Sequence, residues 1–259
     1  MYLWAAAAAG GAEIRDVMKS AAIDAQLAKL GGGEHVAVHE GPGYAILLAV
    51  HAGKPGSEEI HAGADEVLWV RRGTARLQLG DARHEIAAGD FIHVPRGTRH
   101  RMDPGAGRIE LVVARVFPTG ENLPARAGFL APRRMPDVLR KAQIEATFAK
   151  FDANQPLHSA ANFTMNYVIY QGRSGPWEAH HGCVDVYFLH VGTARALLGG
   201  EILGAKQEQP GEIRGTGVTG ARTHQIAPGD LVVIPRNGAH HMQPAGEKLG
   251  YLLMKVWVE

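Results

Sequence analysis

The hydrophobic and polar positions of this chain follow one pattern that occurs twice. Each copy begins with a segment that has apolar residues at helical spacing, at 19–30 and again at 140–151. Strand-like runs that end at a glycine turn follow, at 43–56 and 162–175. Both copies finish on an apolar strand, "IELVVARVF" and "LGYLLMKVW". Many short strands with frequent glycine turns are typical of antiparallel barrels, so we predict two homologous all-β domains, each preceded by a short α-helix.

The repeat also fixes the expected domain limits. The stretch "EIHAGADEVLWVRRG" starts at residue 59 and its counterpart "EAHHGCVDVYFLHVG" at residue 178, a separation of 119 residues. A later motif, "HEIAAGDFIHVPRGTRHRM", recurs 140 residues on, which indicates an insertion around 201–222 that we predict to be a hairpin loop or flap. The proline-rich segment 118–136 is the predicted linker. The two domains are therefore expected at 16–117 and 137–259.

Composition narrows the class of protein. The chain has 259 residues, is 46% hydrophobic and carries a net charge of +1, so two ordinary globular cores are expected. Lysine and arginine are scattered and no basic stripe forms, which argues against a nucleic-acid partner. Apart from the N-terminus, no apolar run reaches the roughly 20 residues of a bilayer span, and the single cysteine excludes an intrachain disulfide framework. No membrane partner is expected.

The N-terminal stretch leaves the cellular location open. "MYLWAAAAAGGA" is short and apolar with small residues near a possible cleavage point, but it lacks the basic region of a secretory signal. Both a cytoplasmic and an exported protein fit this pattern.

The repeated motif carries residues that bind metals. Glu59 and His61 lie two apart, so on a strand both side chains project from the same face. Glu66 follows five residues later and needs an intervening turn to reach that side, while His100 arrives from another strand after a proline turn. Charged side chains inside a barrel are costly unless they are paired or bind a metal. Two imidazoles with one or two carboxylates suit a divalent first-row metal with positions left open. The second copy offers the equivalent set, Glu178, His180, Asp185 and His240.

These residues resemble the motifs of the cupin superfamily, G-x5-H-x-H-x3–4-E-x6-G and G-x5-P-x-G-x2-H-x3-N. The resemblance covers most of the chain in both copies. It implies two tandem jelly-roll barrels, a bicupin, usually with one metal site inside each barrel. The matching positions are His61, Glu66, Gly73, Gly89, Pro95, Gly97 and His100 in the first copy, and His180, Asp185, Gly192, Gly229, Pro235 and His240 in the second.

Three departures from the family motifs bear on the chemistry. Glu59 and Glu178 stand where the family has its first histidine, and Asp185 stands where it has glutamate. Asn237 replaces the turn glycine, which is a mild change because asparagine tolerates a left-handed backbone. Two roles stay open for Glu59 and Glu178: metal ligand, or a base beside a metal held by the other three residues.

The resemblance implies a metal-dependent enzyme of oxygenase, isomerase or lyase type, including dioxygenases and decarboxylases, that acts on a small polar organic molecule. The cofactor would be a divalent ion, with iron, manganese, zinc and nickel all compatible with the donors. The alternative is a non-enzymatic bicupin that binds a small ligand or a metal. The two barrels are expected to pack as a pseudo-dimer within one chain, either as a monomer or in a homodimer.

Overall fold

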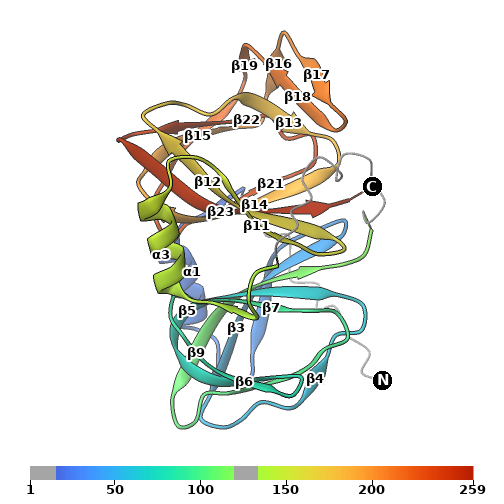
Figure 1. Ribbon diagram of the computed structural model, residues 1–259, viewed down its shortest axis with the longest axis vertical. Coiled ribbons are helices and arrows are strands. Elements are labelled where there is room, and N and C mark those ends of the chain that lie inside the picture. Colours follow the sequence, from blue (N-terminus) through green and yellow to red (C-terminus); the bar gives the residue numbers. More distant parts are fainter. Residues whose placement is uncertain (1–15, 120–133, 259) are drawn as a thin grey trace.

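The protein consists of two jelly-roll β-barrels stacked along the long axis of the molecule (Figure 1). The computed structural model describes residues 16–119 and 134–258, so the alanine-rich start and most of the predicted linker lie outside the described residues. Strands from the first copy form one barrel and strands from the second copy form the other, which confirms the predicted fold class. Among the described residues, no helix combines the length and the apolar character that a bilayer crossing requires.

The first copy contains one helix and a series of strands. Its elements are β1 (Val17–Met18), α1 (Ser20–Leu27), β2 (His35–Gly41), β3 (Tyr44–Ala52), β4 (Glu59–Ile60), β5 (Asp65–Leu79), β6 (Ala82–Ala87), β7 (Phe91–Val94), β8 (Arg99–Asp103) and β9 (Arg108–Val116).

The second copy repeats this order with extra strands. Its elements are β10 (Val138–Leu139), α3 (Lys141–Lys150), β11 (Gln155–Ser159), β12 (Phe163–Gln171), β13 (Trp177–His180), β14 (Cys183–Val191), β15 (Ala194–Leu198), β16 (Glu201–Leu203), β17 (Lys206–Gln209), β18 (Glu212–Gly215), β19 (Gly217–Thr219), β20 (Arg222–Ile226), β21 (Leu231–Ile234), β22 (His240–Pro244) and β23 (Lys248–Trp257).

The two barrels exchange the short strands that precede their helices. β1 pairs with β21 of the second copy, and β10 pairs with β7 of the first copy. Each sheet therefore ends on a strand from the other half of the chain, in the orders β10-β7-β5-β9-β3-β2 and β1-β21-β14-β23-β12-β11. The exchange places α1 and α3 together on one flank of the molecule, where the barrels meet (Figure 1).

Side chains on the two faces of the central strands pack into three separate hydrophobic cores. On β5, Val67 and Trp69 face a core shared by both barrels, whereas Leu68 and Val70 face the interior of the first barrel. The second barrel has its own interior core, which contains Tyr187 and Leu189. Because both faces of these strands are buried, they read as continuous apolar runs in the sequence.

The insertion forms strands. β18 pairs directly with β13, with Glu178 opposite Arg214 and His180 opposite Glu212. β17 extends this edge, while β16 and β19 pair with each other, and these strands form the end of the molecule farthest from the first barrel (Figure 1). The predicted flap is thus an extension of the barrel wall beside the second set of candidate ligands.

The contact region between the barrels, here called the seam, carries different side chains from the two copies at one equivalent position. Arg71 donates hydrogen bonds to the Gly229 carbonyl at 2.9 Å, to Ser20 Oγ at 2.7 Å and to Asp24 Oδ1 at 3.0 Å. His190 occupies the equivalent position in the second copy, where its buried Nε2 has no hydrogen-bond partner among the described residues.

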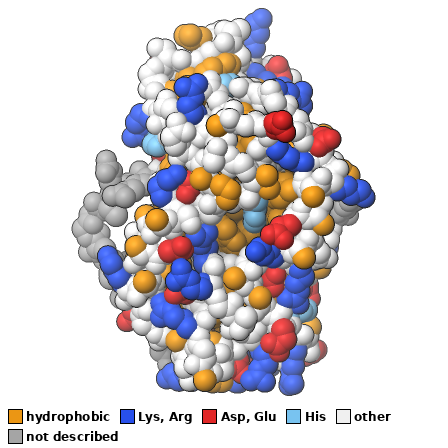
Figure 2. All heavy atoms as spheres, turned by 90° about the vertical axis from the view of Figure 1, so that its left-hand side faces the viewer, with side chains coloured by type: hydrophobic (Ala, Val, Ile, Leu, Met, Phe, Trp, Pro, Cys, Tyr) orange, Lys and Arg blue, Asp and Glu red, His pale blue; other side chains and the backbone are white. Residues whose placement is uncertain are grey.

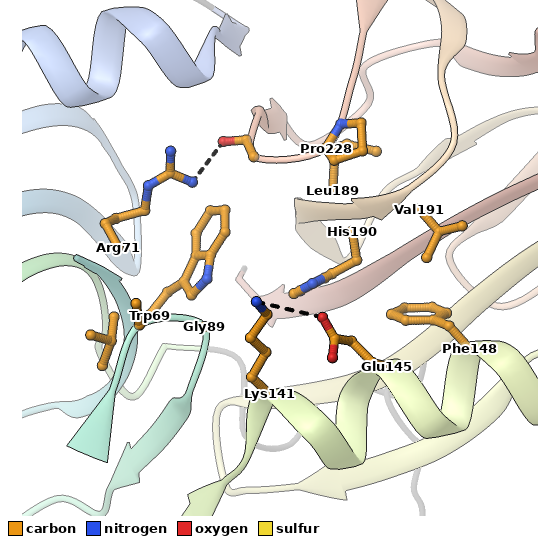
Figure 3. A pocket seen from close by; sticks show the side chains of 13 residues that line it. Trp69, Arg71, Gly89, Lys141, Glu145, Phe148, Leu189, His190, Val191 and Pro228 are labelled. Carbon is orange, nitrogen blue, oxygen red and sulfur yellow. Dashed lines mark hydrogen bonds and ion pairs between the residues drawn. The ribbon is translucent and has the colours of Figure 1, made fainter. Parts of the chain in front are cut away.

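A pocket of about 280 Å³ lies along this seam, with Arg71 and His190 in its lining (Figure 3). One face of the molecule shows an apolar hollow at mid-height, where the two halves meet (Figure 2).

We predict that His190 makes the seam sensitive to acid. Burial, reinforced by the charge of Arg71, lowers the pKa of His190 to about 4, compared with about 6.5 in an unfolded chain. Between these values the unfolded chain binds the proton more readily, so stability falls as the pH drops from about 6.5 to about 4, by up to about 3 kcal/mol.

Denaturant unfolding of the wild type and of His190→Phe across this pH range measures the effect. The phenyl ring keeps contact with the neighbouring aromatic rings and does not titrate, and His158, whose pKa is also lowered to about 4, is unchanged in the variant. Equal slopes of stability against pH for the two proteins would contradict the prediction.

Candidate metal centres

Three of the four candidate side chains in each barrel converge on one point. Donor atoms of Glu59, His61 and His100 all lie within 4.8 Å of one another. Glu59 is directly opposite His100 in the pairing of β4 with β8, and its Oε2 lies 3.3 Å from His61 Nε2. The imidazole ring centres of His61 and His100 are 5.2 Å apart. The E-x-H spacing and the cross-strand pairing together bring these groups to one side of the barrel.

The second barrel repeats this arrangement. Glu178, His180 and His240 also have donor atoms within 4.8 Å of one another. Glu178 is opposite His240 in the pairing of β13 with β22, with 3.3 Å between Oε1 and Nε2. The two imidazole ring centres are again 5.2 Å apart.

Backbone contacts orient the second histidine of each set. His100 Nδ1 lies 3.1 Å from the Thr98 carbonyl and His240 Nδ1 lies 3.0 Å from the Gly238 carbonyl, so each Nδ1–H donates to the backbone. This assignment leaves Nε2 with its lone pair turned toward the other two groups, as in histidines that bind metals.

The turn before this histidine requires a left-handed backbone in both copies. Gly97 has φ 76° and Asn237 has φ 65°. The amide of each donates to the carbonyl of the first histidine, His61 at 3.0 Å and His180 at 2.8 Å. The turn therefore ties the two histidines of each set together, and asparagine fills the glycine position as the sequence predicted.

The fourth candidate of each set forms an ion pair with a basic residue. Arg115 Nη2 lies 2.6 Å from Glu66 Oε1, and Lys255 Nζ lies 2.9 Å from Asp185 Oδ1. Register explains both pairs, because Glu66 is opposite Arg115 on β9 and Asp185 is opposite Lys255 on β23. These carboxylates remain next to the histidines: Glu66 lies 3.5 Å from His61 Nε2, and Asp185 lies 3.5 Å from His180 Nε2.

The charges of the second site favour a neutral His180 beside ionised carboxylates, whereas contact with Glu178 outweighs burial and raises the pKa of His240. Burial, together with the charge of Lys255, lowers the pKa of His180 to about 3. Burial acts to raise the pKa of Asp185, but Lys255 and the two histidines outweigh it and lower the value to about 2. The pKa of Glu178 is lowered as well, because contact with His240 and nearby positive charge outweigh burial. Ionised carboxylate and neutral imidazole are the forms that bind metals.

The comparisons with known proteins agree with this geometry. Residues 46–114 match the family model of the cupin domain, and they span the first barrel from β3 to β9. The first barrel therefore contains a cupin domain. No curated protein matches it in sequence.

Solved cupin structures align with both barrels. A salicylate 1,2-dioxygenase from Pseudaminobacter salicylatoxidans has a TM-score of 0.65 over 93% of this chain and 83% of its own, at 9% identity. A cupin 2 conserved barrel domain protein from Leptotrichia buccalis has a TM-score of 0.60 over 95% and 98%, at 14% identity. An oxalate decarboxylase from Lactobacillus farciminis has a TM-score of 0.54 over 88% and 82%, at 16% identity. At such identities the likeness shows the fold alone.

The two barrels differ in access to their candidate sites. The first set faces a cavity of about 660 Å³, whose lining includes Glu59, His61, Glu66, His100 and Arg115. The Glu59 side chain is 44% exposed, whereas its counterpart Glu178 is 15% exposed. In the second barrel Arg214 on β18 approaches Glu178 at 3.8 Å and pairs with Glu212 at 2.6 Å, so the insertion covers that site.

Sequence reasoning missed Arg115 and Lys255. A signal was present, since the apolar runs near the ends of the two copies, "VVARVF" and "LLMKVW", each contain one basic residue at the same place. Such a residue inside a buried strand requires an acidic partner. Sequence also could not indicate that the insertion pairs with β13.

We predict that the Asp185–Lys255 pair is necessary for the second barrel to stay folded. Asp185→Asn leaves the Lys255 ammonium, which is 4% exposed, without the negative charge that it contacts, and should cost about 3–5 kcal/mol of unfolding free energy. The double variant Asp185→Asn/Lys255→Met should lose far less, because neither residue of the pair is then left as an uncompensated buried charge. Chemical denaturation of both proteins measures the difference.

The matched control is Glu66→Gln in the first barrel. It should cost less than Asp185→Asn, because the Arg115 side chain is 15% exposed and lines the cavity. A double variant as unstable as Asp185→Asn alone would show that the ion pair is not the cause.

Proposed function

We propose that the first barrel is a metal-dependent active site that acts on a small organic molecule, and that the second barrel holds the same donors in a closed interior. One observation supports the proposal. The two triads have the same residue types and the same distance between ring centres, but the first triad faces a cavity of about 660 Å³. That volume falls within the roughly 300–1,000 Å³ of small-molecule sites.

The residues present fit a divalent metal. One carboxylate and two imidazoles are donors that first-row metals accept. In the second barrel His240 Nε2 is buried and makes no hydrogen bond with the residues that the structure describes, although it faces a carboxylate and another imidazole. A buried polar atom left unpaired is costly, and a bound cation would satisfy it. Glu59, His61 and His100 would hold the ion in the first barrel, and Glu178, His180 and His240 in the second.

A metal at the first site would supply a Lewis acid that polarises an oxygen of the substrate, or a binding position for dioxygen. The protein itself supplies the surroundings. Arg115 holds Glu66 at the cavity wall with two hydrogen bonds to Oε1, at 2.9 Å and 2.6 Å, which leaves Oε2 to accept a proton or hydrogen bond from a bound molecule. The cupins of similar fold are named for salicylate and oxalate, which are small organic acids that a cavity of this size would admit.

We predict close to two metal ions per chain in protein purified without a histidine tag and measured by inductively coupled plasma mass spectrometry. His61→Ala and His180→Ala should each remove one ion, since each loses a donor from a different barrel. Iron would indicate oxygen chemistry, whereas manganese, zinc or nickel would indicate isomerase, lyase or hydrolytic chemistry. Turnover should disappear in His61→Ala.

His181→Ala is the matched control, because His181 is adjacent to His180 in sequence but exposed. It should retain both ions. A protein that stays free of metal after reconstitution, or turnover that survives both chelation and His61→Ala, would overturn the proposal. Loaded protein that binds a small ligand tightly and never converts it would support the non-enzymatic alternative.

A further inference from the structure

The two barrels carry different side chains at positions that their registers make equivalent. Leu68 on β5 is opposite Val113 on β9, and Tyr187 on β14 is opposite Leu253 on β23. Likewise Leu111 is opposite Ala49, and Tyr251 is opposite Val168. The second barrel therefore has two tyrosine side chains where the first barrel has two leucines.

In the second barrel these tyrosines fill the interior beside the metal-binding residues. Their rings stack with centres 4.4 Å apart, and the Tyr187 ring centre lies 6.3 Å from that of His240. The Tyr187 hydroxyl donates to Asp185 Oδ2 at 3.3 Å. The barrel thus holds a phenol next to the triad, with its hydroxyl on the carboxylate and its ring among apolar side chains.

The first barrel keeps a carboxylate at the place of the one that accepts from that phenol, and it lacks the phenol itself. Leu47, Leu68, Leu111 and Val113 line its cavity, and Glu66 stands where Asp185 stands in the other barrel. Glu66 is held by Arg115 in the same way that Asp185 is held by Lys255. The cavity has an apolar wall for a ring and an acceptor for a hydroxyl at the equivalent place.

We propose that the cavity of the first barrel binds a single-ring hydroxyaromatic compound, whose ring takes the place that the tyrosine rings occupy in the second barrel. The inference rests on the proposed function, since it names the substrate class of that same site. The ring packs on the four apolar residues, and the hydroxyl donates to Glu66. This geometry puts the ring carbons that flank the hydroxyl next to the triad of Glu59, His61 and His100.

The test uses p-cresol, which is the tyrosine side chain as a free molecule, and toluene, which lacks the hydroxyl. Isothermal titration calorimetry on the full-length, metal-loaded protein should show p-cresol binding at one site per chain. Toluene should bind about ten- to a hundredfold more weakly, the factor expected for one lost hydrogen bond to a carboxylate. Equal affinities for the two compounds, or no binding of p-cresol, would overturn the proposal.

Two variants exchange the interiors of the barrels. Leu68→Tyr/Leu111→Tyr fills the first cavity in the manner of the second barrel and should weaken p-cresol binding at least about tenfold. Tyr187→Leu/Tyr251→Leu empties the second barrel, and p-cresol should raise its melting temperature by more than it raises that of the wild type, because the compound also replaces the lost rings. Unchanged binding in the filled variant would overturn the proposal. If that variant does not fold, Leu68→Tyr alone and the emptied variant provide the same comparison.

Metal content separates this inference from the proposed function. The filled variant should keep both ions, because neither leucine belongs to a triad. Loss of p-cresol binding with both ions retained supports the hydroxyaromatic site. Wild-type protein that holds two ions and turns over an organic acid without binding p-cresol would refute the inference alone, whereas absence of metal would refute the proposed function.

Discussion

One buried ion pair in each barrel determines how the other charged groups of the site are arranged. An isolated carboxylate inside a β-barrel would lose several kcal/mol of hydration, so it requires a cation in contact. Arg115 and Lys255 provide that cation on the last strand of each copy, directly across the sheet from Glu66 and Asp185. With this carboxylate already neutralised, the remaining acid and two histidines are free to form a second cluster.

This division of the acidic residues gives each site two distinct parts. The triad supplies one charge and two neutral donors, which suits a metal, and the paired carboxylate supplies an acceptor that the cation keeps in place. In the superfamily motif the residue at the position of Glu66 is the acidic ligand. Here Glu59, at the position of the first histidine, joins both imidazoles in one cluster and lies 3.3 Å from His61 Nε2, compared with 3.5 Å for Glu66. The basic residues at 115 and 255 hold the carboxylates of Glu66 and Asp185 in ion pairs. The glutamates at 59 and 178, which replace the first histidine of the motif, supply the carboxylate of each triad instead.

Sequence predicted the parts of the structure that depend on short-range geometry. The E-x-H pair projects from one face because strands have a period of two, and Asn237 adopts the left-handed backbone that its glycine counterpart adopts. The parts that it did not predict depend on pairing between distant strands. β1 and β10 are two residues long, and nothing in "VM" or "VL" indicates that each joins the opposite barrel. The contact of β18 with β13 likewise depends on a free strand edge, which sequence does not show.

The separation of the cores explains how the two interiors were able to diverge. The core between the barrels uses Val67, Trp69 and Phe188, whereas the barrel interiors use Leu68 on one side and Tyr187 on the other. Because neighbouring residues on a strand face opposite sides, a change from tyrosine to leucine empties one barrel and leaves the seam contacts in place. The strand registers are the same in both copies at these positions. Access to the two sites therefore differs through side-chain volume and the β18 edge, and the backbone that positions the triads has stayed the same.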